Sequence, residues 1–165
     1  MKFNKVENMS GSRGFTLIEL MVTIAVAAIL VMIAAPSFGT MMENQNLKRS
    51  TQDLVAILTD ARSQAVLQRV EVEVKLNKNV DALSAAERVA LNNKLLFIWQ
   101  PQAKAVLKSS SPTSITFQLT GAVKSYDANI KDKPFVICNK AGGSKSKEVS
   151  FSIVGTPRVV EGTCS

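Results

Sequence analysis

A continuous apolar run of 21 residues, 15–35, dominates the N-terminal part of the chain, and Glu19 is the only charged residue in it. Its length is close to the ~20 residues that a helix needs to cross the ~30 Å hydrocarbon core of a bilayer. A carboxylate near the start of such a run is costly, by roughly 2.5–3.5 kcal/mol at mid-bilayer and less toward the interface. We therefore expect Glu19 to meet a cation at the same depth, presented by another copy of the same segment.

A periodic, amphipathic pattern follows this run. One helical face collects the apolar residues, at spacings of three, four and seven: Leu47, Leu54, Ile57, Leu58, Ala61 and Ala65. Because helical periodicity resumes beyond Pro36, we expect this proline to kink a continuing helix; the alternative is that the helix ends there. The pattern thus predicts a transmembrane or assembly helix over 15–35 and its amphipathic continuation over 36–68.

The period changes to two after the helix. In 70–76, valines alternate with charged residues, which is typical of a half-buried strand. Other segments read as strands, with a short surface helix at 84–91 capped by Ser84 and Glu87 and a Gly/Ser/Lys hairpin loop at 140–147; the strands are 95–100, 114–119, 135–139, 149–154 and 158–160. A long helix followed by an antiparallel β-sheet head domain over 69–165 is an α+β fold.

The charge of the chain is +7, and the basic residues at its start change the interpretation of the apolar run. Lysine and arginine before a span favour a cytoplasmic N-terminus and an exported C-terminus. An ordinary secretory signal peptide is the alternative. Its cleavage site would fall at Ala34-Ala35-Pro36, a poor candidate because proline follows directly, and the run is longer than a signal h-region. A moderately basic exported domain is compatible with anionic partners and with simple solubility.

Two cysteines, Cys138 and Cys164, lie in the part expected to be exported. In an oxidising compartment such a pair is expected to form a disulfide. A redox pair or a metal site is the alternative, but the spacing is far from CxxC. The chain has no histidine, which excludes Ser-His-Asp and Cys-His nucleophilic sites and the commonest metal ligand. We expect a protein that is not an enzyme, with no catalytic residues, no metal site and no cofactor.

The sequence Gly-Phe-Thr-Leu-Ile-Glu at 14–19, with a basic leader before it and an apolar helix after it, resembles the class III signal of type IV prepilins and type II secretion pseudopilins. The resemblance implies that residues 1–14 are a leader, that prepilin peptidase cleaves between Gly14 and Phe15, and that the new N-terminal Phe15 is methylated. It implies that Glu19 forms the assembly salt bridge with the free amine of Phe15 on a neighbouring subunit. The helix-kinking proline of that family falls on Pro36.

The C-terminal third carries a narrower resemblance. The strand Val-Ile-Cys-Asn at 136–139, a glycine-containing loop, Val-Ser-Phe-Ser-Ile at 149–153 and Gly-x-x-Arg at 155–158 are similar to the GspH/FimT group of minor pilins and pseudopilins, which includes FimU. The paired cysteines look more like the pilus members of that group. The resemblance implies a type IV pilin-like fold and a minor pilin that takes part in initiating or capping type IV pilus assembly, for twitching motility, adhesion or DNA uptake.

Partners and location follow from the same resemblance. The implied partners are prepilin peptidase, the other minor pilins and the major pilin, contacted through N-terminal helices in the inner membrane. The protein would cross the bacterial inner membrane once, with its C-terminus in the periplasm, and would then enter the tip or base of a pilus. Two alternatives stay open, the H-type pseudopilin of a type II secretion system and a DNA-binding minor pilin for natural transformation.

The nucleic-acid alternative depends on basic residues near the C-terminus. Members of the FimT type take up DNA, and the resemblance ascribes this to a Gly-Arg-x-Arg motif. Here Gly155-Thr156-Pro157-Arg158 lacks the first arginine of that motif. Four residues are candidates for a cationic patch that contacts phosphates without sequence preference: Lys140, Lys145, Lys147 and Arg158. A solvated hairpin is the alternative, and we favour it.

Overall fold

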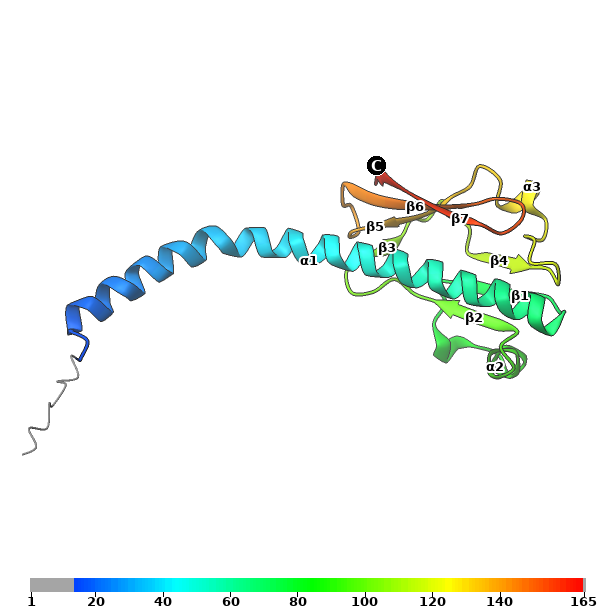
Figure 1. Ribbon diagram of the computed structural model, residues 1–165, viewed down its shortest axis with the longest axis horizontal. Coiled ribbons are helices and arrows are strands. Elements are labelled where there is room, and N and C mark those ends of the chain that lie inside the picture. The colour runs from blue at the N-terminus through cyan, green and yellow to red at the C-terminus, as the bar shows by residue number, and fades with distance from the viewer. Residues whose placement is uncertain (1–13, 165) are drawn as a thin grey trace, which may run out of the picture. The chain divides into compact units, whose positions relative to one another are not determined.

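The computed structural model describes residues 14–164, apart from the side chains of residues 34–36. The predicted leader, except for Gly14, therefore lies outside the described residues. The chain divides into two compact units, Met1–Gly39 and Thr40–Ser165. The helix α1 (Leu17–Gln68) runs from the first unit into the second, where two small sheets complete a head domain (Figure 1). The α+β fold with a long N-terminal helix is thus confirmed.

Helix α1 is 52 residues long and begins within two residues of the predicted start. Because its range includes position 36, the helix does not end at Pro36. That proline kinks the helix stays a prediction, since residues 34–36 lie outside the described side chains. Among the described residues, no single helix is long and apolar enough to cross a membrane, whereas Leu17–Ile33 and Ser37–Gln68 pass as a bent pair, by length and composition alone.

The second half of α1 buries the predicted apolar face against the head. Leu54, Ala61 and Ala65 are fully buried, and Ile57 is partly buried against the same core. Two polar residues lie in the same stripe. The Thr51 hydroxyl donates to the carbonyl of Leu47 at 2.8 Å. The Ser50 hydroxyl accepts from the backbone N–H of Gln102 at 2.9 Å, so both are buried with their hydrogen bonds satisfied.

The first sheet contains β1 (Val72–Leu76), β2 (Leu96–Trp99) and β4 (Ser114–Phe117) in the order β2-β1-β4. Strand β4 pairs antiparallel with β1, but β2 runs parallel to it. A parallel pair needs a crossover connection. Here the crossover holds the 3-10 helix η1 (Val80–Ala82) and the helix α2 (Ala85–Asn92). The predicted capping box is present, since the Ser84 side chain accepts from the N–H of Glu87 and the Glu87 carboxylate accepts from the N–H of Ser84.

The second sheet is wholly antiparallel, with the order β3-β5-β6-β7. Its strands are β3 (Val106–Leu107), β5 (Phe135–Cys138), β6 (Lys145–Phe151) and β7 (Pro157–Thr163). A short helix, α3 (Tyr126–Asn129), lies in the connection before β5.

The predicted start of the strand at 149–154 was wrong. Strand β6 begins at Lys145 rather than at 149 and ends at Phe151, so the predicted hairpin loop over 140–147 is shorter than expected. The first four residues of β6 are polar, and the sequence pattern therefore resembled a loop. They are in a strand because they pair with both neighbouring strands.

The core lies between α1 and the two sheets. Trp99, Phe117 and Phe135 are fully buried, and Phe151 packs edge-on against both phenylalanines, with ring centroids 6.3 and 6.0 Å away. Both sheets thus contribute aromatic rings to one core.

Arg62 of α1 connects two turns at one end of this core. Its Nε donates to the carbonyl of Gly121 at 3.1 Å. Gly121 and Gly155, in the turns after β4 and β6, both have φ near +79°, which glycine adopts at little cost. A Cβ on Gly155 would lie 2.5 Å from the Gly121 carbonyl and 3.1 Å from the Arg62 side chain. The two turns therefore lie next to each other and against the side chain of Arg62.

Candidate functional site

The predicted cleavage site lies just before the first turn of α1. Gly14 and Phe15 precede the helix, and the Phe15 side chain is 85% exposed. Among the described residues, a Cβ on Gly14 would meet no atom within 4 Å. No packing contact with the described part of the chain therefore requires glycine at this position, and both residues are exposed to solvent.

Glu19 lies in the first turn of α1. The Thr16 hydroxyl accepts a hydrogen bond from the backbone N–H of Glu19 at 3.2 Å, which is the geometry of an N-cap residue. The carboxylate is exposed, and among the described residues it makes no ion pair. Negative charge in a first turn is favourable by about 0.3–1 kcal/mol through the helix dipole. The carboxylate is thus placed near the helix start and available to a partner outside the chain.

The apolar side chains around Glu19 are also exposed in the part of the chain that the structure describes. Every described side chain of Leu17–Ile33 is exposed. The large apolar ones are 51–77% exposed: Leu17, Ile18, Leu20, Met21, Val22, Ile24, Val26, Ile29, Leu30, Val31, Met32 and Ile33. An exposed apolar surface of this extent is typical of an interface with another protein or with a membrane.

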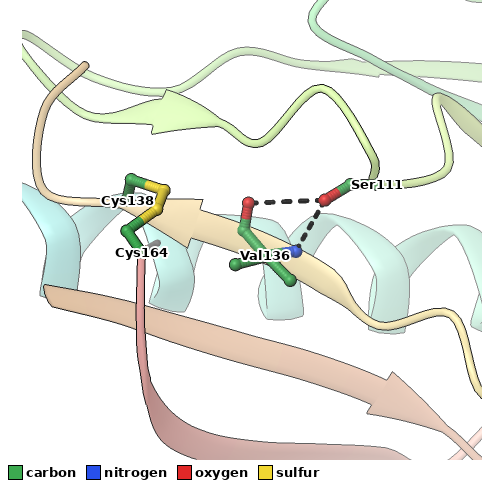
Figure 2. The surroundings of a disulfide bond; sticks show 4 residues. All are labelled: Ser111, Val136, Cys138 and Cys164. Carbon is green, nitrogen blue, oxygen red and sulfur yellow. Dashed lines mark hydrogen bonds between the residues drawn. A yellow bond between two sulfur atoms is a disulfide. The ribbon is translucent and has the colours of Figure 1, made fainter. Parts of the chain in front are cut away.

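The predicted disulfide is present between Cys138 of β5 and Cys164, which follows β7 (Figure 2). Their Cα atoms are 5.8 Å apart, within the usual range for a disulfide. The backbone N–H of Cys164 donates to the carbonyl of Ser144 at 3.1 Å. Because β6 lies between β5 and β7, the bond joins β5 to the end of β7 across β6.

The side chain of Ser111 is hydrogen-bonded to the backbone of β5 close to this disulfide. Its hydroxyl accepts from the backbone N–H of Val136 at 2.9 Å and is 3.5 Å from the carbonyl of the same residue (Figure 2). Both residues are buried. The segment before β4 is therefore fixed to β5 two residues before Cys138.

The four candidate basic residues do not form one patch. Lys140 pairs with Glu43 of α1 at 3.2 Å, and Lys147 pairs with Glu161 at 3.1 Å. Lys145 and Lys147 line one cavity together. Arg158 is opposite Ser150 in the ladder, whereas Lys147 is opposite Glu161, so Arg158 is three positions away and, by strand alternation, on the other face of the sheet. DNA binding stays a prediction.

The structure adds three residues that sequence reasoning did not assign to a site. Thr16 caps α1, and its spacing to Glu19 is a capping pattern that the sequence does contain. Glu43 is nearly buried and pairs with Lys140 and, at 3.9 Å, with Lys104. Lys48 joins Lys145 and Lys147 around one cavity. No local signal in the sequence links Lys48 to a hairpin about a hundred residues later.

Comparison with known families gives the class first. Residues 9–35 match the prokaryotic N-terminal methylation motif, which includes Gly14, Phe15 and Glu19. The motif indicates membrane anchoring through the N-terminal helix and processing by a prepilin peptidase. Residues 50–155 match the family of type II transport protein GspH. That match covers more than half of the chain, so the chain belongs to the GspH family and is a pilin-like protein of the type II secretion and type IV pilus group.

Two kinds of relatives come from Pseudomonas aeruginosa. Type II secretion system protein H is 26% identical over 140 residues, which is 85% of this chain and 72% of that protein. A fimbrial protein is 36% identical over 64 residues, which is 39% of this chain and 41% of that protein. This chain therefore matches less than half of the fimbrial protein. No solved structure gives a significant match.

Proposed function

We propose that this chain is a minor pilin that enters a type IV pilus through α1 and helps to initiate or cap its assembly. Prepilin peptidase would cleave between Gly14 and Phe15 and methylate the new terminus. The processed chain would cross the inner membrane once, with its head in the periplasm, before joining the filament. Its chemistry is assembly with other pilins and the major pilin, not catalytic turnover.

One observation carries this proposal, the exposed carboxylate of Glu19 within an apolar helix segment whose described side chains are all exposed as well. Cleavage after Gly14 would create a terminal ammonium four residues before Glu19. The amine of one subunit and the carboxylate of the next would then satisfy each other when the helices pack together. Two opposite charges that are buried as a pair cost less than one buried alone, and an orphaned charge costs about 3–5 kcal/mol.

The choice of a pilus over a secretion system has a weaker basis. The disulfide between Cys138 and Cys164 supports the pilus through the resemblance to pilus members of the group. The secretion alternative is supported by the relative with the longest match, type II secretion system protein H. The H-type pseudopilin of a type II secretion system is therefore the second candidate function.

The test replaces Glu19 with alanine in the full chain and measures cleavage and incorporation separately. We expect Glu19→Ala to be cleaved between Gly14 and Phe15 at the normal rate, because the cleavage bond is unchanged. We expect its amount in sheared filaments to fall by at least about tenfold, as an orphaned ammonium of about 3–5 kcal/mol requires. Mass spectrometry of the N-terminus and quantitative blotting of filaments give the two readouts.

The matched control is Asp60→Ala, which removes an exposed carboxylate from the second half of the same helix. It should be incorporated normally. Normal incorporation of Glu19→Ala would contradict the pairing. A strain in which the gene for this chain is deleted distinguishes the two functions. Loss of surface pili with normal exoprotein release supports the minor pilin, and the reverse result supports the pseudopilin.

A further inference from the structure

A groove separates the second half of α1 from the outer part of the second sheet. Two cavities of about 430 and 330 Å³ lie along it. Both are lined by Lys48 of α1 and Lys147 of β6, so they are parts of one groove. Leu47 and Val55 of the helix and Val159 of β7 supply apolar walls. The groove therefore combines an apolar lining with lysines.

The charges of this groove are mostly unneutralised. Among the described residues, neither Lys48 nor Lys145 makes an ion pair. Lys147 pairs at 3.1 Å with Glu161, whose side chain is 87% exposed. Because the Glu161 carboxylate is in solvent, this ion pair contributes little to stability, and another carboxylate can therefore replace Glu161. Three ammonium groups and one exposed carboxylate leave a net positive groove.

Strand β7 forms the rim of the groove and is the last strand of its sheet. Antiparallel residues alternate between positions that bond to the partner strand and positions that point away from it. The backbone N–H of Ser152 donates to the carbonyl of Thr156 at 3.1 Å, and the backbone N–H of Cys164 donates to the carbonyl of Ser144 at 3.1 Å. These two bonds fix the alternation from 156 to 164 and place the even-numbered residues of β7 against β6.

The odd-numbered residues of β7 therefore direct their backbone groups away from the sheet. The backbone N–H groups of Val159, Glu161 and Thr163 point outward, whereas Pro157 has no N–H. The side chains of Val159 and Glu161 line the groove. Val159 and Val160 are 43% and 41% exposed, so no described part of the chain covers this strand. The outward backbone groups of an uncovered edge strand are a template for another strand.

We propose that the groove between α1 and β7 binds an extended acidic segment of a neighbouring pilin-like subunit, which joins the second sheet as a strand beside β7. Its backbone would bond to Val159, Glu161 and Thr163. Its carboxylates, at alternate positions on the groove side, would reach Lys48, Lys145 and Lys147. Strand addition combines main-chain hydrogen bonds with pockets for alternate side chains, and both are present here. The proposal takes the neighbouring subunit from the proposed function and adds how the head recognises it.

The charge of the whole head favours an acidic occupant. Residues 40–165 contain 17 lysines and arginines and 11 aspartates and glutamates, a net charge of +6. A basic segment would be repelled by the head and by all three lysines of the groove. Complementary charge increases the association rate and excludes wrong partners, so the groove selects for negative charge as well as for an extended backbone.

The test uses the full chain, labelled with nitrogen-15, in detergent micelles. The probe is a synthetic octapeptide with blocked ends that alternates glutamate and threonine, and a peptide with lysine in place of glutamate is its control. At saturation with the acidic peptide, we expect the amide hydrogens of Val159, Glu161 and Thr163 to exchange roughly tenfold more slowly or better, because they become hydrogen-bonded. The amides of Arg158, Val160 and Gly162, already bonded to β6, should change little.

Variants separate the two features of the groove. The double variant Lys48→Glu with Lys147→Glu should weaken binding of the acidic peptide by roughly tenfold or more. Arg158→Glu, on the same strand but on the other face, should bind nearly as well as the wild type. Val159→Pro removes one outward N–H without removing a bond to β6, and should weaken binding beyond the effect of Val159→Ala. The affinities are measured with peptides that carry a fluorescent label, by the change in fluorescence on binding.

Three results would overturn the proposal. They are no binding of the acidic peptide, equal binding of the acidic and basic peptides, or unchanged exchange at Val159, Glu161 and Thr163. The exchange measurement needs no variant, so a misfolded Val159→Pro chain does not weaken the test. Peptide binding is also independent of filament incorporation, and a failure of this proposal is therefore distinguishable from a failure of the Glu19 pairing.

Discussion

The two halves of α1 are alike in secondary structure but opposite in where their apolar side chains find contacts. In Leu17–Ile33 every described side chain is exposed. In the second half, Leu54, Leu58 and Ala61 are at most 1% exposed, because the strands of the head cover them. The second half completes a core within one chain. The described side chains of the first half remain exposed.

This difference explains why the two halves have different hydrophobic patterns. A helix that packs on one sheet needs one apolar stripe. A helix surrounded by other helices or by lipid needs apolar residues on all sides, as Leu17–Ile33 has. Substitutions in the second half should therefore change the stability of the head, and substitutions in the first half should change assembly. The predictions below test that separation.

The largest expected effect comes from a matched pair of phenylalanines. Phe117 is fully buried in the head, whereas Phe38, in the first unit, is 67% exposed. Phe117→Ala should lower the free energy of unfolding of the head by about 3–5 kcal/mol, through lost burial and a cavity. Phe38→Ala should change it by no more than about 0.5 kcal/mol. Urea denaturation followed by the fluorescence of buried Trp99 measures both, and a destabilised head in Phe38→Ala would contradict the separation.

A slightly smaller effect is expected from the disulfide, which lies entirely within the head. Replacing Cys138 and Cys164 with alanine opens a loop with a sequence separation of 26. Loop-closure entropy predicts a loss of about 3–4 kcal/mol. Reduction of the wild-type head should reproduce this loss, and reductant should not affect the double variant. Cleavage between Gly14 and Phe15 should be unchanged in both, since these residues precede α1 and lie outside the head.

The smallest effect concerns Glu87, a carboxylate that has the partners Glu19 lacks. Hydrogen bonds from Lys75 first, then from Lys78 and from the backbone N–H of Ser84, hold the pKa of Glu87 well below its usual range. A lowered folded-state pKa stabilises the fold above the unfolded-state pKa of about 4.3. That contribution is lost as the pH falls through the folded-state pKa.

Glu87→Gln should therefore be less stable than the wild type at pH 7, by a small amount because the group lies at the surface. The difference between the two proteins should shrink steadily below about pH 4. Urea midpoints from pH 7 to pH 2 measure it. Glu19→Gln is the comparison, and it should leave the urea midpoint of the head unchanged at every pH.

Much of the fold could be predicted because its signals are local. The stripe from Leu47 to Ala65, the alternation in β1 and the capping box at Ser84 each depend on residues a few positions apart. The residues of the methylation motif form an equally local signal, since Gly14, Phe15 and Glu19 lie within six consecutive residues. Their roles in cleavage and pairing stay predictions.

Features that depend on distant residues could not be predicted. The parallel pairing of β1 and β2 joins residues more than twenty positions apart, and no local pattern specifies its direction. Strand β3 has two residues, too few for a period. The polar start of β6 became clear only from its pairing with β5 and β7. The groove depends on Lys48 and Lys147 meeting across the head, which follows from tertiary packing alone.

The contact of Arg62 with the turns at Gly121 and Gly155 has a consequence for how the head comes apart. One turn belongs to each sheet, so neither sheet can separate from α1 without disturbing the arginine that also supports the other. Heat should therefore melt the two sheets together, in a single calorimetric peak whose enthalpy agrees with the van't Hoff value. The head is therefore expected to be either fully folded or fully unfolded, with no stable form that retains only one sheet.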